Sequence, residues 1–252
     1  MRLLVRNRMA VVLATVALAA ACGGGSSPGT GAAGNALGGA TASVANAAAP
    51  SGDSFPRGNA AGNKGNPPPS LAAVGEYGEN LYDAVTAGRW AAARAIMDSL
   101  DRSTTGLPDD ARIRSERTEL RRVADSLRAA VERRTQPAAR ALSNRITYLA
   151  ARMTAPYGPP TPPEVTLLDY YGRELQIWSA DSARLARTAR EIRSTWDAVR
   201  STVERHGGAA AAAVMERYVT QVATARSSAA YARVADSLLA QVDELEKVFA
   251  KR

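Results

Sequence analysis

The sequence predicts an all-α protein: an antiparallel helical bundle of about five to seven helices behind a disordered N-terminal tether. Residues 71–252 are rich in Ala, Leu, Arg and Glu and show no strand-like alternation, which favours helix over strand. Their apolar residues also recur at intervals of three and four, as they do on one face of a helix. Five segments have this spacing: 120–131, 142–153, 168–178, 192–203 and 231–245.

Turn-forming residues divide the predicted domain into successive helices. A first helix ends or bends at Gly88, and a second follows to Leu100, before a turn over residues 103–110. Residues 80–100 resemble one helix-turn-helix unit of the tetratricopeptide type. A solenoid needs about three such units, so we expect this segment to be a helical hairpin of the bundle instead.

Further breaks are predicted in the second half of the domain. Pro137 suits the first turn of a new helix. Residues 179–182 either cap another helix or lie within a continuous one, and His206 with the two glycines after it ends a helix. The last helix either runs unbroken over residues 209–249 or kinks near residues 227–228.

The first 22 residues have the layout of a secretory signal. An arginine-rich start is followed by an apolar run over residues 9–21 and then by Cys22, the only cysteine of the chain. The run is shorter than the roughly 20 residues that a membrane-spanning helix requires. Residues 18–22, Leu-Ala-Ala-Ala-Cys, resemble the lipobox of bacterial lipoproteins, although that family most often has Leu where Ala19 stands. The alternative is an ordinary signal peptide.

The lipoprotein resemblance implies a membrane anchor. It implies that residues 1–21 are removed as a signal peptide and that Cys22 then carries diacylglycerol on its sulfur and an acyl chain such as palmitate on its amine. The implied location is the outer membrane or the cell surface, with the membrane as a partner through this lipid. Two or more acyl chains hold a protein firmly, since each buried methylene contributes about 0.8 kcal/mol.

Residues 22–70 form the predicted tether between the lipid and the domain at residues 71–252. Gly, Ala, Ser, Asn and Pro dominate the tether, and only Asp53, Arg57 and Lys64 are charged. Such a segment buries too little apolar surface to offset the entropy of ordering it. We therefore expect a disordered chain with an end-to-end distance on the order of 40 Å.

The residues that could perform chemistry do not form a recognisable catalytic pattern. One histidine, His206, and one cysteine cannot make a His/Cys metal site, and the chain has neither a nucleophile elbow nor a phosphate-binding glycine loop. Glu164, Asp169 and Glu174 lie on one predicted helix, where we expect them on solvated faces rather than in a catalytic site. The sequence therefore predicts no enzyme activity, catalytic residue, metal or cofactor.

A proline-rich loop is the clearest candidate for partner recognition. Residues 155–163 read Ala-Pro-Tyr-Gly-Pro-Pro-Thr-Pro-Pro, an extended segment that loses little entropy on binding. The alternative is a stiff connector between two helices. The candidate residues are Tyr157, Pro159, Pro160, Pro162 and Pro163.

The net charge narrows the choice of partner. The chain has 32 basic and 24 acidic residues, and loss of the three signal-peptide arginines leaves 29 against 24, a net charge of +5. This modest excess on an exported protein argues against nucleic acid and favours an envelope protein or an anionic surface polymer. We expect Arg184, Arg187, Arg190 and Arg193 on a solvated, salt-bridged helix face.

Two functions fit these features best. The first is a lipid-anchored cell-envelope lipoprotein with a non-enzymatic helical interaction module. The alternative is an accessory or solute-binding lipoprotein that holds a small ligand in a cleft of the bundle. The aromatic residues expected to line such a cleft are Trp178, Trp196, Tyr171 and Tyr218. An enzyme with converging carboxylates ranks third.

Overall fold

The computed structural model describes residues 66–250, and these residues confirm the all-α prediction. They hold eight α-helices, two short 3-10 helices and no strand. The signal peptide, Cys22 and most of the predicted tether lie outside the described residues. The 3-10 helices are η1 (Ala111–Ile113) and η2 (Ala155–Tyr157). The α-helices are α2 (Pro69–Thr86), α3 (Trp90–Thr105), α4 (Arg114–Glu132), α5 (Gln136–Thr154), α6 (Pro163–Ile177), α7 (Ser182–Arg205), α8 (Ala209–Thr224) and α9 (Ser228–Ala250).

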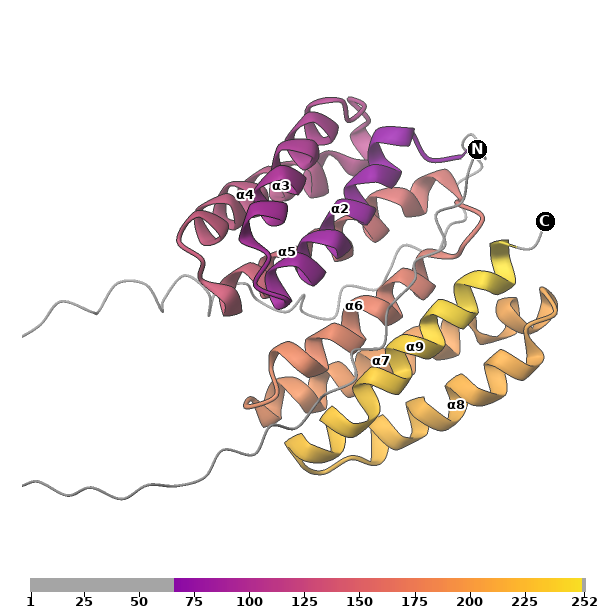
Figure 1. Ribbon diagram of the computed structural model, residues 1–252. Coiled ribbons are helices and arrows are strands. Elements are labelled where there is room, and N and C mark those ends of the chain that lie inside the picture. Colours follow the sequence, from indigo (N-terminus) through magenta and orange to yellow (C-terminus); the bar gives the residue numbers. More distant parts are fainter. Residues whose placement is uncertain (1–65, 251–252) are drawn as a thin grey trace, which may run out of the picture. The chain divides into compact units, whose positions relative to one another are not determined.

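The helices form two four-helix bundles (Figure 1). In the first bundle, α3 packs against α2 and α4, and α5 packs against the same two helices. In the second, α7 and α9 each pack against both α6 and α8. The predicted hairpin is the α2–α3 pair. Contacts between α5 and α6 join the bundles, so α6 has neighbours from both of them.

The helix boundaries follow local sequence signals. Gly88 and Gly207 adopt left-handed φ angles of 68° and 84° just after α2 and α7, a conformation that costs glycine little. Asp181 caps α7, because its side chain accepts a 2.9 Å hydrogen bond from the backbone N–H of Arg184. Residues 225–227 separate α8 from α9, so the C-terminal segment is two helices rather than one long one.

The predicted apolar stripes build the core. Leu81, Leu120 and Ile146 of the first bundle have no exposed surface, and neither have Trp196 and Leu245 of the second. Fully burying a large apolar side chain contributes about 1.5–3 kcal/mol, so these residues supply much of the driving force for packing. Within residues 66–250, no helix is both long enough and apolar enough to cross a membrane.

The expectation of solvated faces on α6 is wrong for Asp169 and Glu174. Both residues are 5% exposed because α5, α7 and α9 pack around this helix. Asp169 lies 2.8 Å from the guanidinium of Arg173, and Glu174 lies 3.4 Å from that of Arg184. Arg184, also expected on a solvated face, is therefore buried with its partner. Removing one member of a buried ion pair typically costs about 3–5 kcal/mol, so the Glu174–Arg184 pair favours one packing of α6 against α7, whereas the Asp169–Arg173 pair lies within α6.

Candidate ligand groove

A groove runs along α7, where this helix adjoins α6 and the start of α9. Its volume is about 920 Å³, within the range of roughly 300–1,000 Å³ that is typical of ligand sites. Leu167 and Tyr171 of α6 line it, together with Tyr148 of α5 and Tyr231 of α9. The groove is therefore built by helices of both bundles, and α7 supplies most of its lining.

Three neighbouring tyrosines connect the bundles at this groove. The ring centroids of Tyr148 and Tyr170 lie 5.0 Å apart, as do those of Tyr170 and Tyr171. Aromatic pairs at this separation attract each other beyond the effect of the area they bury. The guanidinium of Arg145 lies 4.4 Å from the centroid of the Tyr148 ring and forms a 2.6 Å ion pair with Glu119. The tyrosine positions are thus fixed by contacts among α4, α5 and α6.

Two groove tyrosines have hydroxyl groups without a hydrogen-bond partner in the described part of the chain. Tyr171 is 8% exposed and Tyr231 is 7% exposed, and both line the groove. Their rings are buried, while their hydroxyl oxygens remain accessible. Burial, and then the charge of Glu191, raise the pKa of Tyr171 above its ordinary value. The Tyr171 hydroxyl therefore stays protonated and can donate a hydrogen bond into the groove.

The charges that line the groove are balanced. Arg193 is already bound, since it lies 2.9 Å from Glu216 and 3.6 Å from Asp197. Arg190, Glu164 and Glu191 form no ion pair with another of residues 66–250, which leaves them able to bind a ligand. The three arginines and three acidic residues of the lining are Arg190, Arg193, Arg226, Glu164, Glu191 and Asp197.

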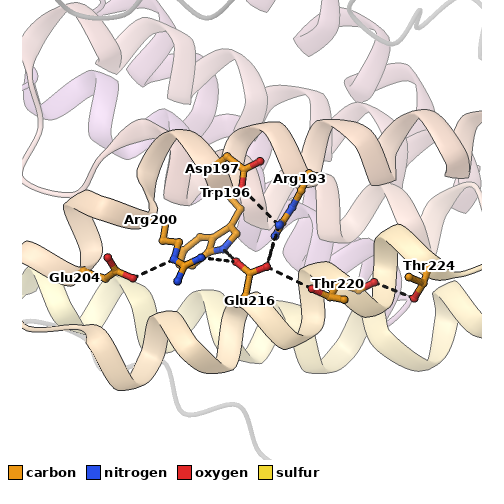
Figure 2. Close-up of polar contacts among 8 residues, drawn as sticks. All are labelled: Arg193, Trp196, Asp197, Arg200, Glu204, Glu216, Thr220 and Thr224. Atoms are coloured by element: carbon orange, nitrogen blue, oxygen red, sulfur yellow. Dashed lines mark hydrogen bonds and ion pairs between the residues drawn. The ribbon is translucent and has the colours of Figure 1, made fainter.

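Glu216 of α8 fixes the edge of the groove formed by α7 (Figure 2). Its carboxylate accepts a 2.8 Å hydrogen bond from the indole Nε1 of Trp196 and two hydrogen bonds of 2.9 Å from Arg193. Arg200 donates another at 3.2 Å and is itself paired with Glu204. Because Trp196 is fully buried, its N–H group requires such a partner. Glu216 therefore ties α8 to α7 and restricts the Arg193 side chain.

A second polar cluster lies inside the contact between α5 and α6. Asn144 donates hydrogen bonds of 3.1 Å to the carboxylate of Glu174 and to the backbone carbonyl of Tyr170. The guanidinium of Arg184 lies 3.7 Å from the centroid of the Trp178 ring. Burial raises the pKa of Glu174, against the lowering effects of Arg184 and Asn144. The chain's own side chains enclose this carboxylate, so we interpret the cluster as structural.

The four aromatic residues predicted to line a cleft do not lie together. Tyr171 lines the groove, whereas Trp196 lies in the core of the second bundle. Trp178 is half-buried at the C-cap of α6. Tyr218 is half-buried on α8 and is not among the residues that line this groove.

The sequence pattern missed two groove tyrosines. Tyr148 lies between the members of the apolar stripe of α5, and Tyr231 belongs to the apolar stripe of α9. Spacing along one helix cannot show which side chains from different helices meet.

The proline-rich loop connects α5 to α6, and its tyrosine is held by the chain itself. The hydroxyl of Tyr157 donates a 2.8 Å hydrogen bond to Asp110, and the guanidinium of Arg112 lies 4.7 Å from the ring centroid. Much of the Tyr157 side chain is thus already in contact with η1. The prolines lie at the start of α6 or in the turn before it: Pro159, Pro160, Pro162 and Pro163.

The described residues hold no cluster of metal-ligating side chains, and the chain matches no known family. Within residues 66–250, no three His, Cys, Asp or Glu side chains lie close enough together to hold a metal ion. Protein-family models, curated proteins and solved structures give no match to the chain.

Proposed function

We propose that this chain is an exported, lipid-anchored lipoprotein of the cell envelope, whose helical domain is a non-enzymatic interaction module. The observation that carries the proposal is the N-terminal order of basic residues, apolar run, small residues and Cys22. In this proposal Cys22 bears the lipid, and residues 22–70 hold the domain away from the membrane surface. An envelope protein or a surface polymer is then the partner of the domain.

The surroundings of the carboxylates on α6 support an interaction role over a catalytic one. A catalytic acid or base must come within hydrogen-bond reach of its substrate. Asp169 and Glu174 are instead packed against α5, α7 and α9 and bound to Arg173 and Arg184. Glu164 is the one member of the predicted carboxylate set that lines the groove.

The substitution Cys22→Ser tests the anchor. Serine has no sulfur to receive diacylglycerol, so the variant should incorporate no labelled palmitate and should not show the mass of a lipidated chain that begins at residue 22. Mass spectrometry and palmitate labelling in the producing cell measure both outcomes. The control is Ser26→Ala, close to the same cleavage point, which should be labelled like the parent. Labelling and mass equal to those of the parent in Cys22→Ser would contradict the proposal.

The groove supports a second candidate function, a lipoprotein that holds a ligand. Tyr148, Tyr171 and Tyr231 converge on it from three helices. Glu164 and Glu191 add carboxylates that no other described residue binds as an ion pair. Binding sites commonly combine such an apolar or aromatic lining with a few polar groups that orient the ligand.

A further inference from the structure

We propose that the groove along α7 binds a neutral, polyhydroxylated ligand, namely a segment of a surface glycan. This inference depends on the proposed ligand-holding function but not on the lipid anchor. The residues that carry it are Tyr171, Tyr231, Glu164, Arg190 and Glu191, all of which line the groove. None of their side chains forms a hydrogen bond or ion pair with another described residue.

The tyrosine hydroxyls are the first reason for this ligand class. Tyr171 and Tyr231 are each more than nine-tenths buried as residues, but their hydroxyl oxygens remain accessible and have no protein partner within residues 66–250. A phenol O–H can donate one hydrogen bond and accept others. A sugar hydroxyl can likewise donate and accept hydrogen bonds, so it can pair with a tyrosine hydroxyl that acts as donor or as acceptor. Two such accessible groups on the groove suit a ligand with several hydroxyls.

The balance of charge is the second reason. Glu164 and Glu191 oppose the binding of a polyanion, and Arg190 and Arg226 oppose that of a polycation. A neutral polyol is repelled by neither set of charges. Its hydroxyls can donate hydrogen bonds to the carboxylates and accept them from the guanidinium groups. The pattern thus favours a neutral glycan over the anionic surface polymer that net charge alone suggests.

Small apolar residues on α7 provide the third reason. Ala186, Ala189 and Ala198 line the groove, with Leu167 of α6 also in the lining. Their short side chains let a ring approach the helix backbone closely. The C–H groups of a sugar ring are apolar and can bury against such a surface, while the hydroxyls at the ring's edge reach the polar groups.

Calorimetric titration of the full mature chain in detergent tests the proposal. The probes are three neutral oligosaccharides, namely maltohexaose, cellohexaose and chitohexaose, and one polyanion, a hyaluronan hexasaccharide. At least one neutral probe should bind saturably. Tyr171→Phe, which removes a single hydroxyl, should weaken that binding roughly three- to tenfold, and Glu191→Gln should also weaken it. Tyr218→Phe, outside the groove, is the matched control and should bind like the parent.

Three results would overturn the glycan proposal. One is the absence of saturable binding by all three neutral probes. Another is binding that Tyr171→Phe and Glu191→Gln leave unchanged while both variants keep the parent's melting temperature. The third is tighter binding of hyaluronan that weakens steeply with salt, which would indicate a polyanion site. None of these results would affect the lipid anchor, which is measured separately by the palmitate labelling of Cys22.

Discussion

Asp110 illustrates how one side chain can hold distant parts of the chain together. Its carboxylate accepts a 2.9 Å hydrogen bond from the backbone N–H of Arg112 and a further one of 2.8 Å from the hydroxyl of Tyr157. Hydrogen bonds from the Arg112 side chain and backbone are the main reason that the pKa of Asp110 lies well below its ordinary value of 3.8. The Tyr157 contact therefore gives the proline-rich loop a structural role beside any role in recognition.

Acid should destabilise the domain through Asp110. A carboxylate whose pKa is depressed by folding contributes stability above its unfolded-state pKa and loses that contribution as the pH falls through the folded-state pKa. The free energy of unfolding of the parent should thus fall more steeply between about pH 4 and pH 2 than that of Asp110→Asn. Urea unfolding followed by circular dichroism at a series of pH values measures both slopes.

Tyr157→Phe provides an intermediate case for the same measurement. It removes one of the hydrogen bonds to Asp110 and leaves those from Arg112 in place. The fall in its free energy of unfolding with decreasing pH should therefore be less steep than in the parent and steeper than in Asp110→Asn. Parallel pH profiles for the parent and Asp110→Asn would show that this carboxylate does not contribute in the way its contacts indicate.

At the scale of helices, α6 and α9 pack closely together at Gly172. A methyl group added there would lie 2.6 Å from Cδ2 of Leu239 and 3.0 Å from Cδ2 of Leu238. Both leucines are buried, so moving them disturbs the core. At Gly75 of α2, the same methyl group would meet the Cβ of Ala150 at 3.5 Å, an ordinary contact.

Alanine should therefore have opposite effects at these two glycines. Gly172→Ala should lower the free energy of unfolding by about 1–3 kcal/mol because it overpacks the contact between α6 and α9. Gly75→Ala should raise it by about 0.5–1 kcal/mol because alanine is the better helix former. Denaturant unfolding measures both changes. If both substitutions stabilised the domain, the close approach at Gly172 would be refuted.

The helices could be predicted from sequence because each one repeats its core face at intervals of three and four. The arrangement of the helices could not be predicted, since the same spacing of apolar residues occurs in a helix that packs against one neighbour and in a helix that packs against three. Asp169 and Glu174 show the consequence: their polarity predicts a solvated face, but α6 packs between helices of both bundles and buries them beside cationic partners. For the same reason the sequence did not predict that Tyr148 and Tyr231, which lie on different helices, line the same groove.

At the scale of the described domain, polar contacts link the two bundles. Arg173 of α6 is 2% exposed and lies 2.8 Å from Asp169 and 4.9 Å from the centroid of the Tyr82 ring on α2. The Tyr82 hydroxyl donates a 2.9 Å hydrogen bond to Gln176 of α6 and accepts one of 2.8 Å from Arg140 of α5. Separating the bundles would break the contacts of Tyr82 with Arg173 and Gln176 and expose the apolar surface between α5 and α6, so unfolding of one bundle should destabilise the other.

A single unfolding transition is therefore expected for both bundles. In a Trp90→Phe variant the remaining tryptophans are Trp178 and Trp196, so fluorescence reports the second bundle alone, while circular dichroism reports all the helices. The midpoints and slopes of the two urea curves should coincide, as they do for a cooperative unit. Adding Tyr82→Phe, which removes the hydroxyl contacts to Gln176 and Arg140, should shift both curves together to lower urea. Two separate midpoints in Trp90→Phe would mean that the bundles unfold independently and that the contacts between α5 and α6 position them without coupling their stability.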